Sequence, residues 1–328
     1  MKSIIVVALI CGVGACPFPD GLVGNWTTAT IGTLVITKTT LQTTSTAYLS
    51  TAQKYECMFN YTFNNETSYV LKSTTSKVII SGIPALFFWM CIEFHESHAD
   101  AYYHYINMPL GTGVIVTRLS AQLSGADVKG YNVCTTARAL EEFEPMIREG
   151  TALNGSSACP EPLIGTNYFD YITTSGTKDC STNYTGYLES CFDQNKTRLD
   201  VVTNTSCTAN PFSTTGKQLN CLFTIPIGNE TSDKYITMLY NMDKGAASPF
   251  FCMFLDGLDN STRSKASVAP GTCVLGQNAS VVPTSGFRLE LYTNDTCNGA
   301  QQNQAPPFCT SVCMMTFAVL KFVVLTPL

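Results

Sequence analysis

The chain is poor in charged residues and lacks recognisable catalytic motifs. Of its 328 residues only 13% are charged, and the formal net charge is -5. Nucleic-acid binders need a basic stripe or patch, so this class of protein is excluded. No serine lies in a Gly-x-Ser-x-Gly elbow, and no glycine-rich phosphate loop is present. The sequence therefore offers no support for an enzyme and predicts no cofactor.

Apolar runs long enough to span a bilayer comfortably are also missing, and the two short ones lie at the ends. Met1 and Lys2 give a positive start, residues 4–10 are apolar, and small residues follow at positions 13–15. This pattern predicts a signal peptide over residues 1–15. An alternative is a bacterial lipoprotein box ending at Cys16.

The other apolar run, residues 314–328, is interrupted by Lys321. Small residues at 298–300, a polar spacer and this run resemble a signal for glycosylphosphatidylinositol attachment, so residues 299–328 are a spacer and tail that would tether the protein to a membrane. The alternatives are a last buried strand and the irregular end of a gene model.

Cysteine, in contrast, is abundant. The chain has fifteen cysteines, and loss of Cys11 with the signal peptide leaves fourteen, an even number that suits complete pairing in an oxidising compartment. The cysteines predicted to form disulfides are Cys16, Cys57, Cys91, Cys134, Cys159, Cys180, Cys191, Cys207, Cys221, Cys252, Cys273, Cys297, Cys309 and Cys313.

Eleven Asn-x-Ser/Thr acceptors are spread over the mature chain, which argues for a secreted eukaryotic glycoprotein and against the lipoprotein. We therefore expect a secreted or surface-tethered protein. The acceptors are Asn25, Asn60, Asn65, Asn154, Asn183, Asn195, Asn204, Asn229, Asn260, Asn278 and Asn294.

Two halves of the chain repeat one another. Cys-Pro-Phe-Pro at residues 16–19 returns as Cys-Pro-Glu-Pro at residues 159–162, and Asn-Glu-Thr-Ser begins eight positions after both Cys57 and Cys221. Each copy then has an aromatic run that ends in a cysteine, Cys91 or Cys252. Preserved order and spacing indicate a duplicated module. We predict one domain over residues 16–150 and a second over residues 151–298.

The second module is longer, and its extra residues, about 175–210, hold Cys180, Cys191 and Cys207. We expect these residues to form an exposed, disulfide-bonded excursion. If the modules are homologous, matched cysteines pair alike. The scheme favoured is Cys57 with Cys91, Cys221 with Cys252, Cys16 with Cys134, and Cys159 with Cys273.

Short β-branched and aromatic runs, separated by polar or glycine turns, predict antiparallel strands. The fold class expected is all-β, with two tandem disulfide-bonded antiparallel modules, each a barrel or a sandwich. One short linker helix is predicted over residues 135–149, interrupted at Pro145. The runs are residues 31–37, 55–59, 78–80, 87–94, 102–105, 113–119 and 285–292.

Gly24-Asn25-Trp26 precedes a threonine-rich strand and resembles the first strand of lipocalin- and avidin-type barrels. That resemblance implies an up-and-down barrel whose closed end is covered by the Trp26 indole. The second module has Gly-Thr-Asn-Tyr at residues 165–168, so its aromatic residue, Tyr168, follows the glycine by one position more than Trp26 follows Gly24. A sandwich core is an alternative place for Trp26.

The Cys-x-Phe-Pro and Gly-x-Trp signatures at residues 16–19 and 24–26 also resemble those of invertebrate secreted or membrane-tethered glycoproteins with tandem cysteine-rich domains. The resemblance covers most of residues 16–297 in cysteine order. It implies a location and an architecture, but no mechanism.

All three histidines, His95, His98 and His104, lie in one ten-residue window beside acidic residues. Imidazole and carboxylate groups bind zinc and copper, so a metal site is one hypothesis. The spacing from His95 to His98 is one residue short of the His-Glu-x-x-His pattern. The interpretation favoured is an exposed polar turn between two strands, with no metal.

Two carboxylate groups invite comparison with the acid and base of a glycosidase. Turn chemistry explains the first group more simply, and the solvated face of the predicted helix explains the second. The groups are Asp256 with Asp259, and Glu141 with Glu142 and Glu144.

Tyr102, Tyr103 and Tyr105 are either a recognition surface or strand packing, with Tyr103 and Tyr105 on one face and Tyr102 on the other. We expect packing.

Three functional hypotheses follow. The first is a non-catalytic recognition glycoprotein whose partner is an unidentified extracellular protein or glycan. The second is a carrier that holds a small apolar ligand in its barrel. The third is a metal-dependent hydrolase that uses His95, His98 and His104. A wide apolar cavity in either module would favour the carrier, and converging imidazoles within a cleft would favour the enzyme. Filled cores with a glycan-free face would favour the recognition protein.

Overall fold

The computed structural model describes residues 16–43, 53–76, 85–109, 118–151, 156–180, 186–203, 211–214, 217–228, 233–243, 248–257 and 263–297. The predicted signal peptide and the predicted spacer and tail lie outside these residues, as do the expected strand at 78–80 and most of the one at 113–119.

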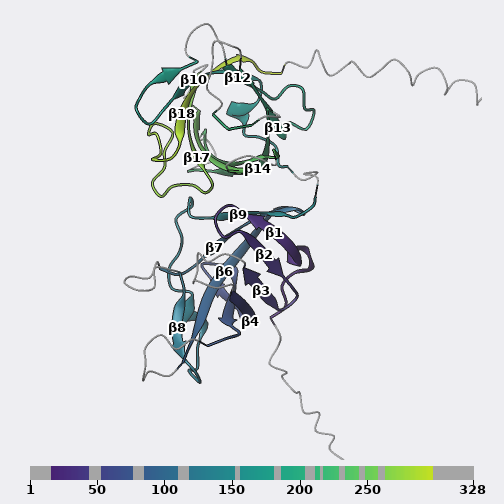
Figure 1. The fold of residues 1–328 in the computed structure, drawn as a ribbon, viewed down its shortest axis with the longest axis vertical. Helices are drawn as coiled ribbons and strands as arrows, with labels where there is room; N and C mark the ends of the chain where they lie inside the picture. The colour runs from purple at the N-terminus through teal and green to yellow at the C-terminus, as the bar shows by residue number, and fades with distance from the viewer. Residues whose placement is uncertain are drawn as a thin grey trace, which may run out of the picture.

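The first half of the chain forms a closed antiparallel barrel (Figure 1). Eight strands follow one another around the ring, because β1 pairs with β2 and so on to β7, which pairs with β9, and β9 pairs with β1. The additional strand β8 pairs with β6 outside this ring. The strands are β1 (Gly24–Thr28), β2 (Thr33–Ile36), β3 (Thr40–Thr43), β4 (Gln53–Phe63), β5 (Glu66–Ser73), β6 (Leu86–His98), β7 (Ala101–Ile106), β8 (Ser120–Leu123) and β9 (Glu144–Arg148).

The second half repeats this up-and-down ring of eight strands, with β10 paired to both β12 and β18 and with β11 added beside β10. The all-β prediction with two antiparallel modules is confirmed, and both modules are barrels. The strands are β10 (Thr166–Ile172), β11 (Lys178–Asp179), β12 (Gly186–Glu189), β13 (Arg198–Thr203), β14 (Gln218–Pro226), β15 (Lys234–Asn241), β16 (Phe250–Gly257), β17 (Arg263–Pro270) and β18 (Phe287–Asp295).

The expected excursion at residues 175–210 is wrong, because β12 and β13 are wall strands of the second barrel. Leu188 and Leu199 on these strands are fully buried in its core. The strands hold the place that β2 and β3 hold in the first barrel, so the sequence between Cys159 and Cys221 diverged while the strand order was kept.

Helical structure among the described residues is confined to three short elements: η1 (Asp20–Leu22), α1 (Gly130–Val133) and η2 (Glu161–Leu163). The helix predicted over residues 135–149 is wrong, since β9 occupies residues 144–148 and closes the first barrel between β7 and β1. Pro145 disrupts a helix, and an eighth strand at residues 144–148 closes the ring, so that β1 and β7 are not left with unpaired edges.

The disulfide scheme is also wrong in its partners, although matched cysteines do pair alike. Cys16 pairs with Cys57 and Cys159 with Cys221, and the second matched set is Cys91–Cys134 and Cys252–Cys273. Cys57 and Cys91 cannot bond because β5 lies between their strands.

Cys191 pairs with Cys297, a bridge that the first barrel does not share, and Cys180 is also disulfide-bonded. Cys207, Cys309 and Cys313 lie outside the described residues.

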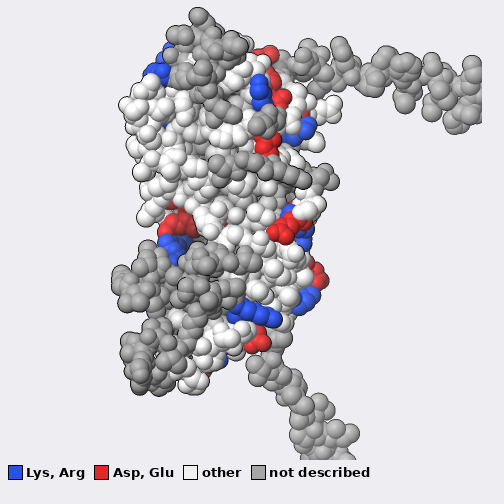
Figure 2. Space-filling view, in the orientation of Figure 1, with Lys and Arg blue, Asp and Glu red and all other residues white. Residues whose placement is uncertain are grey.

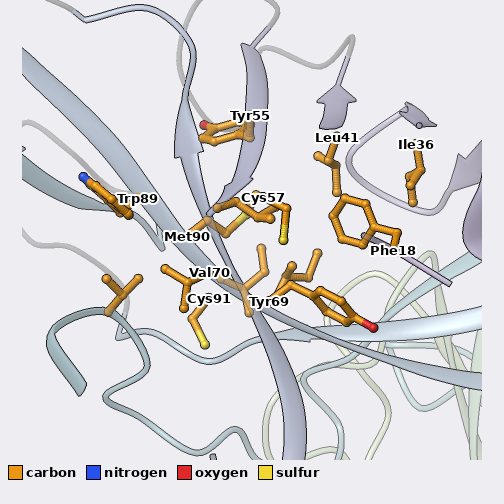
Figure 3. Packing of buried hydrophobic residues seen from close by; sticks show 14 of the residues in the cluster. Phe18, Ile36, Leu41, Tyr55, Cys57, Tyr69, Val70, Trp89, Met90 and Cys91 are labelled. Carbon is orange, nitrogen blue, oxygen red and sulfur yellow. The ribbon is translucent and has the colours of Figure 1, made fainter. Parts of the chain in front are cut away.

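Each barrel encloses an apolar core. Figure 3 shows Phe18, Ile36 and Leu41 gathered in the first core, with Tyr55 and Met90 nearby. Alternate residues of each strand face this interior, which we call the lumen, as the period-2 geometry of a strand requires.

A third apolar cluster joins the two barrels, which lie one above the other in Figure 1. The Tyr103 ring of β7 lies 4.7 Å from the Phe223 ring of β14, and Phe143 packs against Phe223 at 5.2 Å. Ser97 Oγ donates a hydrogen bond to the Leu222 carbonyl at 3.0 Å. The barrels therefore share a packed interface.

The described glycan acceptors are exposed, as a bulky glycan requires. They are Asn25, Asn60, Asn65, Asn195, Asn278 and Asn294. The other acceptors, Asn154, Asn183, Asn204, Asn229 and Asn260, lie outside the described residues. On the face drawn in Figure 2, charged side chains form small groups of mixed sign rather than a basic patch.

Candidate functional site

Trp26 lies at one end of the first barrel, which the η1 segment closes. Its side chain is fully buried, and its indole nitrogen donates a hydrogen bond to the Leu22 carbonyl at 2.8 Å. Gly24 allows the chain to turn from η1 into β1 because its φ of 149° is one that other residues rarely adopt. We call this the closed end of the barrel.

Arg148, on the last strand of the ring, holds the closed end together. Its guanidinium lies 4.4 Å from the centre of the Trp26 ring, within the range of a cation–π contact. It also donates hydrogen bonds to the carbonyls of Val23 at 2.9 Å and Gly21 at 2.6 Å. Asp100 pairs with it at 3.1 Å. One side chain thus ties three segments of the chain together.

The second barrel uses a different pair at its closed end. Asn167 follows Gly165 as Trp26 follows Gly24, and it is fully buried. Thr293 pairs with Asn167 as Arg148 pairs with Trp26, and its hydroxyl donates to the Asn167 side-chain oxygen at 2.8 Å. The aromatic Tyr168 is therefore not the counterpart of Trp26.

His104 lies on β7 with its side chain in the first lumen. It is 1% exposed, and neither ring nitrogen finds a hydrogen-bond partner among the described residues. Its pairing with Phe94, whose ring is 5.6 Å away, places it among apolar neighbours. Burial lowers the pKa of His104 to about 3, so its ring is neutral at physiological pH.

Tyr55 presents a second polar group without a partner to the same lumen. It lies on β4, which is separated from β7 by β5 and β6 on the shorter way around the ring. The side chain is fully buried, and its hydroxyl finds no partner in the part of the chain that the structure describes. Burial raises the pKa of Tyr55, so the hydroxyl keeps its proton.

Glu144 is the third polar side chain on this face, since it pairs directly with His104 across β7 and β9. Its carboxylate accepts hydrogen bonds from the Thr30 amide at 2.5 Å, the Thr30 hydroxyl at 2.7 Å and the Ile31 amide at 3.3 Å. Burial raises the pKa of Glu144, although these hydrogen bonds oppose the shift. Glu144 links the β1–β2 turn to β9. Its interpretation as a residue on the solvated face of a helix is therefore wrong.

The matched positions of the second barrel are apolar. Ile106 matches Val268, because each pairs with the residue directly after the equivalent cysteine, Cys91 or Cys252. His104 and Ala266 match because they stand two residues before Ile106 and Val268, and their cross-strand partners, Glu144 and Leu289, match in turn. Tyr55 and Leu219 match because each stands two residues before the equivalent cysteine, Cys57 or Cys221.

No family model, curated protein or solved structure matches this chain. The site must be interpreted from its own geometry. None of the described helices is long and apolar enough to cross a membrane.

The three histidines do not converge. His104 faces the lumen, whereas His95 lies on the outer face of the barrel, stacked at 4.8 Å on Tyr103 and hydrogen-bonded to Glu93 at 2.6 Å. His98 ends β6 and accepts a hydrogen bond from the Asp100 amide at 3.5 Å. No group of three metal-ligating side chains occurs in the described ranges, and the shared metal site is contradicted by this geometry.

The residues around His95 serve the interface between the barrels. Asn107 donates to the other Glu93 oxygen at 2.7 Å. Burial would raise the pKa of Glu93, but its hydrogen bonds to His95 and Asn107 and the His95 charge lower it overall. The expected division of the tyrosines is confirmed, with Tyr103 facing the second barrel and Tyr102 facing the lumen, where its ring lies 5.2 Å from Trp26.

The remaining carboxylates have structural partners. Asp256 forms an ion pair with Lys234 at 3.2 Å, and Asp259 lies outside the described residues. Glu142 accepts a hydrogen bond from Arg118 at 2.7 Å, and Glu141 accepts one from the Gly276 amide of the second barrel at 3.0 Å.

Proposed function

We propose that this protein is a secreted, non-catalytic binding protein that carries a small apolar ligand in the lumen of its first barrel. The observation that carries the proposal is the pair of fully buried side chains, His104 and Tyr55, whose polar atoms have no hydrogen-bond partner among the described residues. A buried polar group without a hydrogen bond costs about 1–3 kcal/mol. A ligand that supplies the missing bonds would recover that cost.

The architecture supports the same proposal. An eight-stranded barrel has an interior just wide enough for packed side chains or one small ligand. Trp26, Arg148 and η1 close one end, so a ligand would enter from the other. The disulfides and the exposed glycan acceptors are consistent with assembly in the secretory pathway.

The test is to express the protein in a eukaryotic secretory host, purify it without organic solvent, and analyse it by native mass spectrometry. We expect a bound small molecule at one copy per chain, released on unfolding. In parallel, bound molecules are removed by solvent extraction from a Trp89→Phe variant. Decanol is then titrated into this protein while Trp26 fluorescence is followed. Absence of any bound molecule, together with no saturable response to decanol or related apolar compounds, would refute the proposal.

A second candidate is recognition of an extracellular protein. The β17–β18 connection favours it, because Val274, Leu275 and Val281 are 41%, 68% and 58% exposed. Large exposed apolar side chains near one another are typical of interaction sites. Glycan mapping at Asn278, on the same connection, decides between the alternatives: an occupied acceptor would shield this surface and count against the candidate.

A further inference from the structure

We infer that the first barrel selects an apolar ligand that bears one neutral hydroxyl or carbonyl group, held between His104 and Tyr55. This inference rests on the proposed carrier function and adds the chemical class of the ligand. Neutral imidazole offers one donor and one acceptor, and the phenol offers a donor. A ligand hydroxyl can accept from one of these groups and donate to the other.

The charges around the lumen argue against an anionic head group. Glu144 lies beside His104 on the same face, so a ligand carboxylate would meet another carboxyl group there and no cation. The cation at the closed end, Arg148, already donates to the carbonyls of Val23 and Gly21 and pairs with Asp100. An anionic ligand would therefore lose its hydration without gaining a counter-ion.

The second barrel supplies an internal control. It closes the same ring with apolar residues at the positions of His104, Glu144 and Tyr55, so the fold itself does not require polar groups there. Among its described residues, the unpartnered atom on the inner face is the Asn167 amide nitrogen at the closed end, where Thr293 donates to the Asn167 oxygen. Its other unpartnered buried atoms, on Asp200, Asn220 and Arg288, belong to residues that alternate with core residues and so lie on the outer face. Polar groups that the fold does not need and does not satisfy are expected at functional sites.

The experiment uses the full secreted chain with Trp89→Phe, which leaves Trp26 as the single tryptophan and the reporter of the first lumen. Three ten-carbon probes are titrated at pH 7: decanol, decanoate and decane. We expect decanol to bind roughly tenfold more tightly than decane, as one or two net hydrogen bonds provide, and decanoate to bind more weakly than decanol.

Two variants test whether Tyr55 and His104 cause the preference for decanol over decane. Tyr55→Phe and His104→Leu should each weaken decanol binding roughly three- to tenfold and so remove most of the preference for decanol over decane. Tyr69→Phe is the matched control: it makes the same substitution in the same barrel, at a hydroxyl that is not among the unpartnered buried groups. It should leave both affinities unchanged. A thermal melt of each variant shows that it is folded.

The outcomes separate the inference from the proposed function. Equal affinities for decanol and decane, or an unchanged preference in both variants, would overturn the inference and leave the carrier function in place. Tightest binding of decanoate would overturn the neutral head group. If no probe alters Trp26 fluorescence and nothing co-purifies with the chain, the carrier function fails as well.

Discussion

Replacement of Arg148 by methionine should destabilise the first barrel and leave the second intact. Methionine keeps an unbranched apolar stem beside Trp26 but removes the guanidinium and every hydrogen bond it donates. The closed end would then lose the link between β9, the η1 segment and Asp100.

The size of the effect follows from the contacts. The bonds to the Val23 and Gly21 carbonyls, at 2.9 Å and 2.6 Å, contribute about 1 kcal/mol each, below the usual range for a charged donor because the Arg148 side chain is 23% exposed. The contact with the Trp26 ring adds about 0.5–1 kcal/mol. The ion pair with Asp100 adds at most a few tenths of a kcal/mol at this exposure. We expect a loss of about 3 kcal/mol.

The assay is urea unfolding followed by tryptophan fluorescence. Both tryptophans, Trp26 and Trp89, belong to the first barrel, so fluorescence reports on that barrel while far-ultraviolet circular dichroism reports on both. The matched control is Thr293→Val in the second barrel, which removes the bond to Asn167 and should leave the fluorescence transition unmoved. A shift below about 0.5 kcal/mol for Arg148→Met would refute the role assigned to this arginine.

Three further predictions concern the interface, the buried histidine and the unmatched disulfide. Phe223→Ala should cost about 3 kcal/mol and lower the stability of both barrels, because Phe223 packs against Tyr103 and Phe143 of the first; an unchanged fluorescence transition of the first barrel would contradict the shared core. The pKa of His104 is lowered from 6.5 to about 3, so unfolding binds a proton below pH 6.5. The stability of the first barrel should therefore fall by about 1.4 kcal/mol per pH unit as the pH drops from 6.5, and His104→Leu should flatten this slope in urea titrations at pH 7 and pH 5. Cys191 and Cys297 are 106 residues apart, so replacing both by serine should cost the second barrel about 3–4 kcal/mol by circular dichroism, with no change in tryptophan fluorescence.

The sequence was informative about the fold because the strands carry local signals. Runs of β-branched and aromatic residues predicted β2, β4, β6, β7 and β18, and the repeated cysteines predicted two similar modules. The helix over residues 135–149 was predicted from composition alone. Composition cannot show that β7 and β1 leave a gap that only a strand fills, and this non-local pairing decides the structure of residues 144–148.

The disulfide partners were predicted wrongly, and the residues that face the lumen were not predicted, because both depend on which strands are neighbours in the barrel. Cysteines that follow one another in the sequence lie on strands separated by a third strand, so spacing misled the pairing. The histidine window was predicted to be an exposed polar turn, which is wrong, because His95 and His98 belong to β6 and His104 is buried on β7. Alternation along these strands sends His95 and His104 to opposite faces. Comparison of the two repeats position by position would have helped, since Tyr55 and Leu219 each stand two residues before a matched cysteine.

The most direct test of the account is a crystal structure of the secreted protein purified without removing bound molecules. We predict electron density for one elongated molecule in the first lumen, with a polar atom within hydrogen-bond distance of both His104 and Tyr55, and no such density at the matched residues Ala266 and Leu219. Density for side chains alone in that lumen, with the His104 and Tyr55 groups bonded to each other or to the protein, would contradict the account.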